Sequence, residues 1–265
     1  MAEPVLVVRR AALGDFVLTL PVIRALTTIA PVFVVTHARS APLLPPGATL
    51  HDDTWLWRGA PPPLPFARAF AFGDVAAEAL RAVNLAVHAV APRPAPGVHA
   101  VDHYAGVLTG VPLPEGAFVR APRVDWAPAP GPAAVILAPG SGGAAKRWPL
   151  DRWRRVADAL GDRGVAARFV RGPDEADEPG WPPDAVCPDL PGLLGLAAGC
   201  RAWLGPDSGP SHLAAAVGAP GRVGVVFGPT DPATWAPVGA RVWPWDTSPA
   251  DLAAWAGASG FTHLD

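Results

Sequence analysis

The residues best suited to chemistry gather in three turns, each where an apolar, strand-like run gives way to a helical pattern. Each turn combines glycines and small side chains with one or two charged residues, and the three are Leu13-Gly14-Asp15, Gly140–Arg147 and Gly205–His212. Glycines let a backbone approach an anion closely, and the free N–H groups at a helix start bind anions. The sequence therefore indicates a ligand site at these turns.

The middle turn reads APGSGGAAKRWP and suits a phosphate group. Gly140 and Ser141 are small, while Lys146 and Arg147 bring positive charge to the start of a helix expected from Leu150. The turn lacks the Gly-Lys-Ser/Thr ending of a P-loop. On residue types alone, an ordinary exposed loop explains it as well as a phosphate site does.

The last turn reads GPDSGPSHLAAAVG and begins a helix. Asp207 or Ser208 at the N-cap and Gly218 at the end make an ordinary helix by capping rules alone. Capping does not explain why so many small groups precede the helix, whose free N–H groups and positive dipole end suit a diphosphate. His212, in the first turn, either adds a hydrogen bond or is an ordinary, partly exposed histidine.

The first turn carries a single carboxylate, Asp15. An aspartate here commonly caps the helix that follows. Alternatively, it faces a cleft and accepts a proton from an attacking hydroxyl group. The residue types leave both roles open.

The elements that position the first turn form a βαβ unit. Val5–Val8 and Val32–Val35 are apolar, β-branched runs typical of strands buried on both faces, and residues 16–26 between them have apolar side chains at helical spacing. Repeated prolines over residues 36–65 argue against regular structure there. Further along we expect a helix over 75–83, a strand over 85–90 and a short helix over 102–108.

Residues 121–132 read APRVDWAPAPGP, and this density of proline and alanine is typical of an interdomain linker. We therefore expect two domains, residues 1–126 and 127–265. After the linker, strands and helices alternate, which predicts a parallel, doubly wound sheet with ligands beyond the carboxyl ends of its strands. The expected strands are 134–138, 166–170, 202–204 and 223–227, and the expected helices are 150–160, 193–198 and 211–217.

Composition argues against several classes of protein. The formal net charge is -2, with Lys+Arg 21 against Asp+Glu 23, so no nucleic-acid partner is expected. The two cysteines are too few for a disulfide framework, and we expect buried thiols in a reducing compartment. The start MAEPVLVVRR lacks the order of a secretory signal, and every apolar stretch ends before about 20 residues. We expect a cytoplasmic protein.

Four blocks, in this order along the chain, resemble glycosyltransferase family 9, the ADP-heptose:lipopolysaccharide heptosyltransferases. They are VLVVRRAALGDFVLTLP from Val5, KRWP from Lys146, the run from Gly205 to Ala216, and FGPTDP from Phe227. The resemblance implies an α/β fold of the GT-B class, with two Rossmann-like domains whose parallel sheets face a central cleft. The C-terminal domain would bind the nucleotide-sugar donor, and the N-terminal domain would bind the acceptor.

The resemblance also implies roles for particular residues. Asp15 would be the general base, and Lys146 would contact the phosphates and assist catalysis. A carboxylate that binds ribose hydroxyls is expected at Asp174 or Glu175, and the sequence does not decide between the two. The other donor-binding residues implied by the resemblance are Gly140, Ser141, Arg147, Asp207, Ser208, Gly209 and His212.

These roles describe an inverting transfer of a heptose or related sugar from a nucleotide diphosphate, ADP-linked by resemblance, to a saccharide or glycolipid acceptor. As the nucleotide departs, negative charge grows on its phosphates, and a lysine and a helix N-terminus stabilise that charge. The sequence has no cluster with the spacing of metal ligands, so we expect neither a metal nor another cofactor. A glycolipid acceptor would bring transient contact with the inner face of the cell membrane.

Family members are commonly longer than this chain, and we expect the difference in the N-terminal domain, over residues 36–96. A shortened acceptor domain leaves two alternatives open. The chain could be a nucleotide-sugar-binding accessory protein without transfer activity, or another GT-B enzyme such as an epimerase or a hydrolase.

Overall fold

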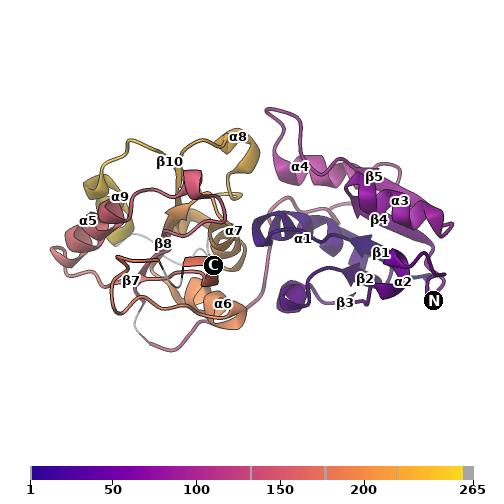
Figure 1. The fold of residues 1–265 in the computed structure, drawn as a ribbon, viewed down its shortest axis with the longest axis horizontal. Helices are drawn as coiled ribbons and strands as arrows, with labels where there is room; N and C mark the ends of the chain where they lie inside the picture. The colour runs from indigo at the N-terminus through magenta and orange to yellow at the C-terminus, as the bar shows by residue number, and fades with distance from the viewer. Residues whose placement is uncertain (1, 132, 176–177, 219, 259–265) are drawn as a thin grey trace. The chain divides into compact units, whose positions relative to one another are not determined.

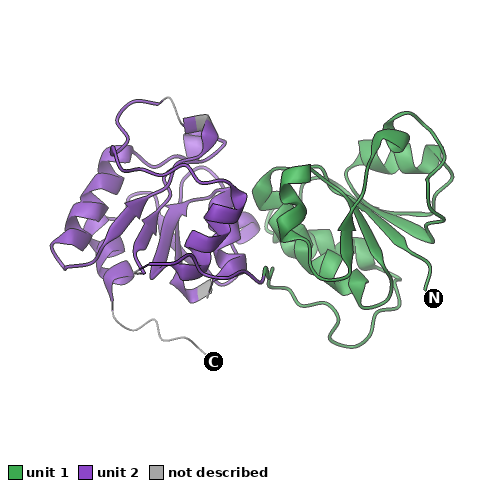
Figure 2. Cartoon of the chain, turned by 90° about the horizontal axis from the view of Figure 1, so that it is seen from below, with its two compact units in different colours: residues 1–124 green, residues 125–265 purple. Residues whose placement is uncertain are grey.

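The computed structural model describes residues 2–131, 133–175, 178–218 and 220–258. The chain divides into two compact units, Met1–Val124 and Asp125–Asp265 (Figure 2), and the division falls inside the proline-rich stretch of the sequence. Each unit is an α/β structure with its own five-stranded sheet. The expectation of two Rossmann-like units with parallel sheets is therefore confirmed, and the central cleft between them stays a prediction.

The N-terminal unit contains the strands β1 (Val5–Val8), β2 (Val32–Val35), β3 (Ala48–Leu50), β4 (Arg68–Phe72) and β5 (Val87–Val90). They lie in the order β3-β2-β1-β4-β5, and every pairing between them is parallel. Its helices are α1 (Leu13–Thr27), α2 (Thr54–Trp57), α3 (Asp74–Ala82) and α4 (Ala100–Ala105), as Figure 1 shows.

Both faces of this sheet carry apolar side chains. All four residues of β1 are buried, and successive side chains of a strand point to opposite faces. Leu6 and Val8 share one core cluster with Ala77 and Leu80 of α3. α1 packs against α4, and α2 packs against α3. The short strand β1 is therefore held from both sides, which fixes the turn that follows it.

The C-terminal unit contains β6 (Val135–Leu137), β7 (Ala167–Phe169), β8 (Ala202–Pro206), β9 (Val223–Phe227) and β10 (Arg241–Pro244), in the parallel order β10-β9-β8-β6-β7. β6 and β8 are neighbours, with Val135 opposite Ala202 and Leu137 opposite Leu204. Its helices are α5 (Leu150–Gly161), α6 (Leu190–Gly199), α7 (Gly209–Val217), α8 (Pro232–Trp235) and α9 (Pro249–Gly257). α5 packs against α9 and α6 against α7, and Figure 1 shows these pairs on opposite sides of the sheet.

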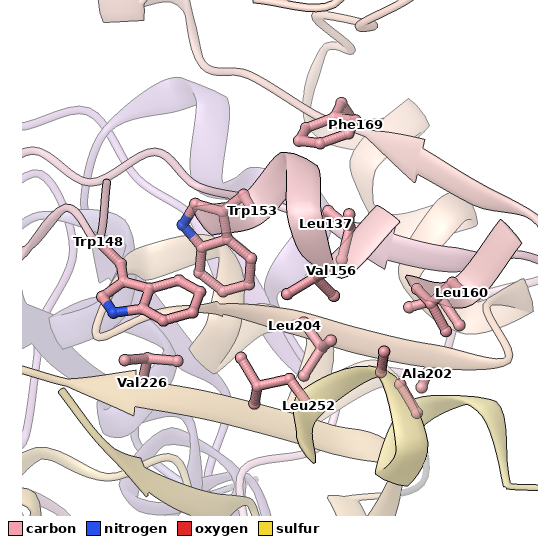
Figure 3. Close-up of a cluster of buried hydrophobic side chains, with 13 residues drawn as sticks. Leu137, Trp148, Trp153, Val156, Leu160, Phe169, Ala202, Leu204, Val226 and Leu252 are labelled. Atoms are coloured by element: carbon pink, nitrogen blue, oxygen red, sulfur yellow. The ribbon is translucent and has the colours of Figure 1, made fainter. Parts of the chain in front are cut away.

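A tryptophan-containing core fills the face of this sheet that α5 and α9 cover (Figure 3). Trp153 of α5 is fully buried and meets Trp148 edge to face, with ring centroids 5.0 Å apart. Leu204 of β8 and Leu252 of α9 belong to the same cluster. Trp153 therefore lies on the core-facing side of its helix. Because Trp148 lies just before α5, this core also fixes the end of the turn that precedes the helix.

Each sheet has one place where the direction of winding reverses. In the N-terminal unit the reversal lies between β1 and β4, and in the C-terminal unit it lies between β6 and β8. At such a switch point the loops after two neighbouring strands diverge, which is where open α/β sheets bind ligands. The three turns singled out from the sequence follow β1, β6 and β8, so all three lie at switch points.

The two cysteines differ in their surroundings. Cys200 is buried, and burial raises the pKa of its thiol to about 11. Cys187 is exposed because it lies outside the helices and strands, between β7 and α6, so the expectation of a buried thiol is wrong for this residue. In the part of the chain that the structure describes, no helix has the length and apolarity needed to span a membrane.

Candidate functional site

Asp207 is the centre of a polar cluster in the C-terminal unit. It follows β8, and its carboxylate meets side chains from the loops after β6 and β9. Lys146 Nζ lies 3.1 Å from Asp207 Oδ2, and the Thr230 hydroxyl donates to the same oxygen at 2.8 Å. His212 Nε2, from the first turn of α7, lies 3.7 Å from Asp207 Oδ1. Two loops and the start of α7 therefore converge on one buried carboxylate.

These partners determine the protonation state of Asp207. Burial raises the pKa of its carboxyl group, but His212, the charge of Lys146 and the Thr230 hydroxyl outweigh burial, so the pKa lies below the usual aspartate value. Asp207 is ionised at neutral pH and pairs with Lys146. An ammonium group has three N–H donors, and the Lys146 side chain is 29% exposed. Lys146 can therefore hold Asp207 and still donate to a phosphate oxygen.

The loop after β6 is fixed by contacts inside the protein. Ser141 Oγ donates to the backbone carbonyl of Asp207 at 3.2 Å. Arg147 Nε donates to the Ser141 carbonyl at 2.7 Å, and its guanidinium lies 3.2 Å from a carboxylate oxygen of Glu175. Glu175 is buried and also accepts the Gly172 N–H at 2.7 Å. The loop therefore has a defined conformation that does not depend on a ligand.

Gly140 has no room for a side chain because Glu175 lies against it. A Cβ at residue 140 would lie 2.7 Å from Glu175 Oε2. We expect Gly140→Ala to lower the free energy of unfolding by about 1–3 kcal/mol, the usual cost of overpacking, in urea denaturation. Gly142→Ala in the same loop is the matched control, since nothing lies within 4 Å of its added Cβ. Equal stability of the two variants would contradict the expectation.

The start of α7 is tightly capped. Ser208 Oγ accepts the Ser211 N–H at 3.4 Å, and the Ser211 hydroxyl donates to the Pro206 carbonyl at 2.8 Å. A Cβ at Gly205 would lie 2.7 Å from Ser211 Oγ, so this turn requires glycine. Ser208 Oγ also lies 3.2 Å from Ser211 Oγ, and because the Ser211 proton goes to Pro206, the Ser208 hydroxyl donates to Ser211. α7 therefore offers an anion chiefly the backbone N–H groups of its first turn, such as that of Gly209.

Asp15 lies in the first turn of α1, and two residues from other elements contact its carboxylate. Tyr104 OH donates to Oδ1 at 2.9 Å, and Arg9 Nη2 lies 3.4 Å from the same oxygen. The Arg9 guanidinium lies over the Tyr104 ring, 4.5 Å from its centroid, and donates to the Phe72 carbonyl at 3.2 Å. The N-cap of α1 is Ala12, without a side-chain hydrogen bond. The capping role considered for Asp15 is therefore wrong.

The structure gathers the sequence-predicted residues into two groups, one in each unit. Asp15 lies in the N-terminal unit, and the side chain of Asp174 lies outside what the structure describes. The group in the C-terminal unit comprises Gly140, Ser141, Lys146, Arg147, Glu175, Asp207, Ser208, Gly209 and His212.

Three contacting residues had no role in the sequence-based prediction: Arg9, Tyr104 and Thr230. Thr230 stands in the FGPTDP block, so that block already carried a signal for it. Tyr104 is 89 positions from Asp15, and no local pattern joins the two.

Among the described residues, no three or more His, Cys, Asp or Glu side chains are placed to hold one metal ion. The positive groups nearest the Asp207 cluster are Lys146, Arg147 and the N-terminus of α7.

Comparison with known proteins matches part of the chain to a family. Residues 116–245 match the model of glycosyltransferase family 9 (heptosyltransferase). Lipopolysaccharide heptosyltransferase 1 of Pseudomonas aeruginosa is 33% identical over 111 residues, which are 39% of this chain and 31% of that protein. The matched segment therefore spans less than a third of the length of that relative.

Solved structures resemble the chain over a larger part of its length. Escherichia coli ADP-heptose lps heptosyltransferase II has a TM-score of 0.72 at 18% identity, covering 96% of this chain and 98% of that one. E. coli heptosyltransferase WaaC with ADP has a TM-score of 0.67 at 20% identity, covering 91% of this chain and 93% of that one. At these identities the likeness concerns the fold, and it confirms the GT-B class.

Proposed function

Because residues 116–245 of the chain belong to glycosyltransferase family 9, we propose that the protein transfers a heptose or related sugar from a nucleotide diphosphate to a saccharide or glycolipid acceptor. The transfer inverts the anomeric configuration. The C-terminal unit binds the donor, and the N-terminal unit binds the acceptor. The observation that carries this proposal is the convergence of Lys146, Asp207 and the start of α7 at the β6/β8 switch point.

The donor site is proposed at this switch point because its groups match a leaving diphosphate. Lys146 and the N–H groups at the start of α7 supply positive charge without a large rearrangement, since Asp207, whose carboxylate accepts from Thr230, already holds the lysine. Gly140, Ser141, Arg147, Glu175 and His212 shape the surrounding loops, and Asp174 or Glu175 would bind the ribose. An ADP-linked sugar is the favoured donor, since a fold relative carries ADP.

Asp15 is proposed as the general base that takes the proton of the acceptor hydroxyl. It sits at the β1/β4 switch point of the other unit, and its side chain is 34% exposed. Attack on the anomeric carbon forms the new glycosidic bond while the bond to the diphosphate breaks, so the proton passes to Asp15 and the electron pair leaves with the nucleotide.

We further propose that the reaction needs no metal, because Lys146 and the α7 dipole supply the charge that a cation would otherwise provide. The protein would be cytoplasmic and would touch the inner face of the membrane only while it holds a glycolipid acceptor. Sedimentation with vesicles of that glycolipid, compared with vesicles of phospholipid alone, tests this contact.

Isothermal titration with ADP, UDP and GDP in the presence of EDTA tests the donor site. We expect one nucleotide, ADP, to bind, and Lys146→Ala to weaken that binding by about tenfold to a hundredfold, the usual effect of losing a charged hydrogen bond. Arg155→Ala is the matched control, because it removes a 71%-exposed cation of α5. The affinity of Arg155→Ala for ADP should equal that of the wild type.

The alternatives predict other results. Absence of binding to any of the three nucleotides would overturn the donor site. Binding that appears only when magnesium replaces EDTA would overturn the metal-independent reaction. Product analysis with ADP-heptose and heptose-deficient lipopolysaccharide separates the enzymes: transfer gives heptosylated acceptor and ADP, epimerisation gives an isomeric nucleotide-sugar, and an accessory protein gives neither.

A further inference from the structure

Asp15 is held by a small buried assembly in the N-terminal unit that includes Tyr104, the only tyrosine of the chain. Tyr104 lies on α4, which packs against α1, the helix that carries Asp15. The tyrosine side chain is buried, and its hydroxyl lies 2.9 Å from Asp15 Oδ1 but 3.5 Å from the Pro92 carbonyl. The single phenolic proton therefore goes to the carboxylate.

Arg9 fixes the tyrosine as well as the carboxylate. Its guanidinium lies 4.5 Å from the Tyr104 ring centroid and 5.4 Å from that of Phe72, and it donates to the Phe72 carbonyl. Arg9 Nη2 also lies 3.4 Å from Asp15 Oδ1. A cation packed against two aromatic rings and tied to a backbone carbonyl has little freedom, so the tyrosine ring beneath it is held in one place.

Both contacts on Asp15 go to the same oxygen, Oδ1. The side chain is nevertheless 34% exposed, so the carboxylate is restrained at Oδ1 while part of the side chain stays accessible to solvent. A base that must take a proton from an outside hydroxyl needs both features, a carboxylate held in one orientation and a side chain that the hydroxyl can reach. One oxygen sets the orientation, and the second receives the proton.

We propose that Tyr104 is a positioning residue that orients Asp15 for proton transfer from the acceptor. The inference rests on the proposed function, because it assigns Tyr104 a part in the reaction of Asp15. Burial raises the pKa of Tyr104, and the nearby Asp15 charge raises it further against the opposing effect of Arg9. The phenol therefore stays protonated near neutral pH and serves as a hydrogen-bond donor rather than as the base.

The test measures ADP release from ADP-heptose, with and without heptose-deficient lipopolysaccharide. Tyr104→Phe keeps the ring under Arg9 and removes only the hydroxyl. We expect kcat to fall by about tenfold to a hundredfold, as for a misplaced catalytic group, with the KM for the donor unchanged. In an Asp15→Asn background the same substitution should cause no further loss, because its effect passes through Asp15.

A second measurement does not depend on activity. With carbon-13 at the hydroxyl-bearing ring carbon of tyrosine, the protein gives one labelled signal, since Tyr104 is the only tyrosine. We expect Asp15→Asn to shift this signal at neutral pH. Asp102→Asn, which changes a 49%-exposed carboxylate on the same helix α4, should leave it in place.

The outcomes separate the two proposals. If Asp15→Asn abolishes activity while Tyr104→Phe retains full kcat, or if the losses simply multiply, the positioning role is wrong and the proposed function stands. If the wild type releases no ADP, the proposed function fails and the positioning role fails with it. If Asp15→Asn is fully active, Asp15 is not the base, so the positioning role fails while sugar transfer by the protein stands. An unmoved tyrosine signal in Asp15→Asn also overturns the positioning role.

Discussion

Asp15→Asn is expected to lower kcat by about a thousandfold, within the usual range for a lost general base. Asparagine keeps nearly the same shape but cannot accept the acceptor proton. Asp15 itself is 34% exposed, but the substitution leaves the buried Arg9 guanidinium without its carboxylate partner. The measurement is the rate of ADP release from ADP-heptose with heptose-deficient lipopolysaccharide, together with titration of ADP.

The affinity for ADP separates the chemical step from donor binding in this experiment. Asp15 and the Asp207 cluster lie in different units, so Asp15→Asn should bind ADP as the wild type does. Asp102→Asn, which alters an exposed carboxylate paired with Arg120, is the control and should keep full activity. A kcat for Asp15→Asn within tenfold of the wild type would refute its role as the base.

Asp207→Ala is expected to lower the free energy of unfolding by about 3 kcal/mol, as when one partner is removed from a buried ion pair. The substitution leaves Thr230 without its acceptor and Lys146 and His212 without their carboxylate. Because Lys146 is 29% exposed, its charge is partly solvated, which keeps the cost at the lower end of the usual range. Urea denaturation at neutral pH measures the loss.

The loss should depend on pH in a defined direction. The pKa of Asp207 is lower in the folded protein than in the unfolded chain, where it is about 3.9. Ionisation of Asp207 therefore stabilises the fold fully above the unfolded pKa, and this stabilisation is lost as the pH falls through the folded pKa. The difference between wild type and Asp207→Ala should therefore be constant above about pH 5 and shrink below about pH 4.

Asp151→Ala is the matched control for Asp207→Ala. It removes a 60%-exposed carboxylate that lies 3.7 Å from Arg155 on α5. Exposed pairs of this kind contribute at most about 0.5 kcal/mol. Equal stabilities of the two variants would mean that Asp207 does not hold its cluster together.

Elements with a strong local pattern could be predicted from the sequence. The valine-rich β1 and β2 and the strand β9 were expected with the bounds that the structure has. The prolines of residues 36–65 hid β3, in which no residue is fully buried and whose neighbour in the sheet is β2. β4 was missed because RAFAF follows a proline-rich stretch, and its place beside β1 depends on long-range pairing.

The candidate site, like the fold, could be predicted only in part. The turns after β1, β6 and β8 could be found because glycine, aspartate, lysine and histidine stand at strand-to-helix junctions. The contacts of Asp15 with Tyr104 and of Asp207 with Thr230 could not, because they join residues that only the packed sheets and helices bring together. The resemblance to a family predicts the reacting groups but not the residues that hold them.

The alignment of β6 with β8 limits how the chain can change over evolution. Val135 and Leu137 stand opposite Ala202 and Leu204, and Asp207 follows one residue after the end of β8. One residue inserted into β8 would advance the chain by about 3.3 Å, more than the 3.1 Å between Lys146 Nζ and Asp207 Oδ2. We therefore expect homologous chains to tolerate insertions at the opposite, amino-terminal edge of this sheet and to reject them within these two strands.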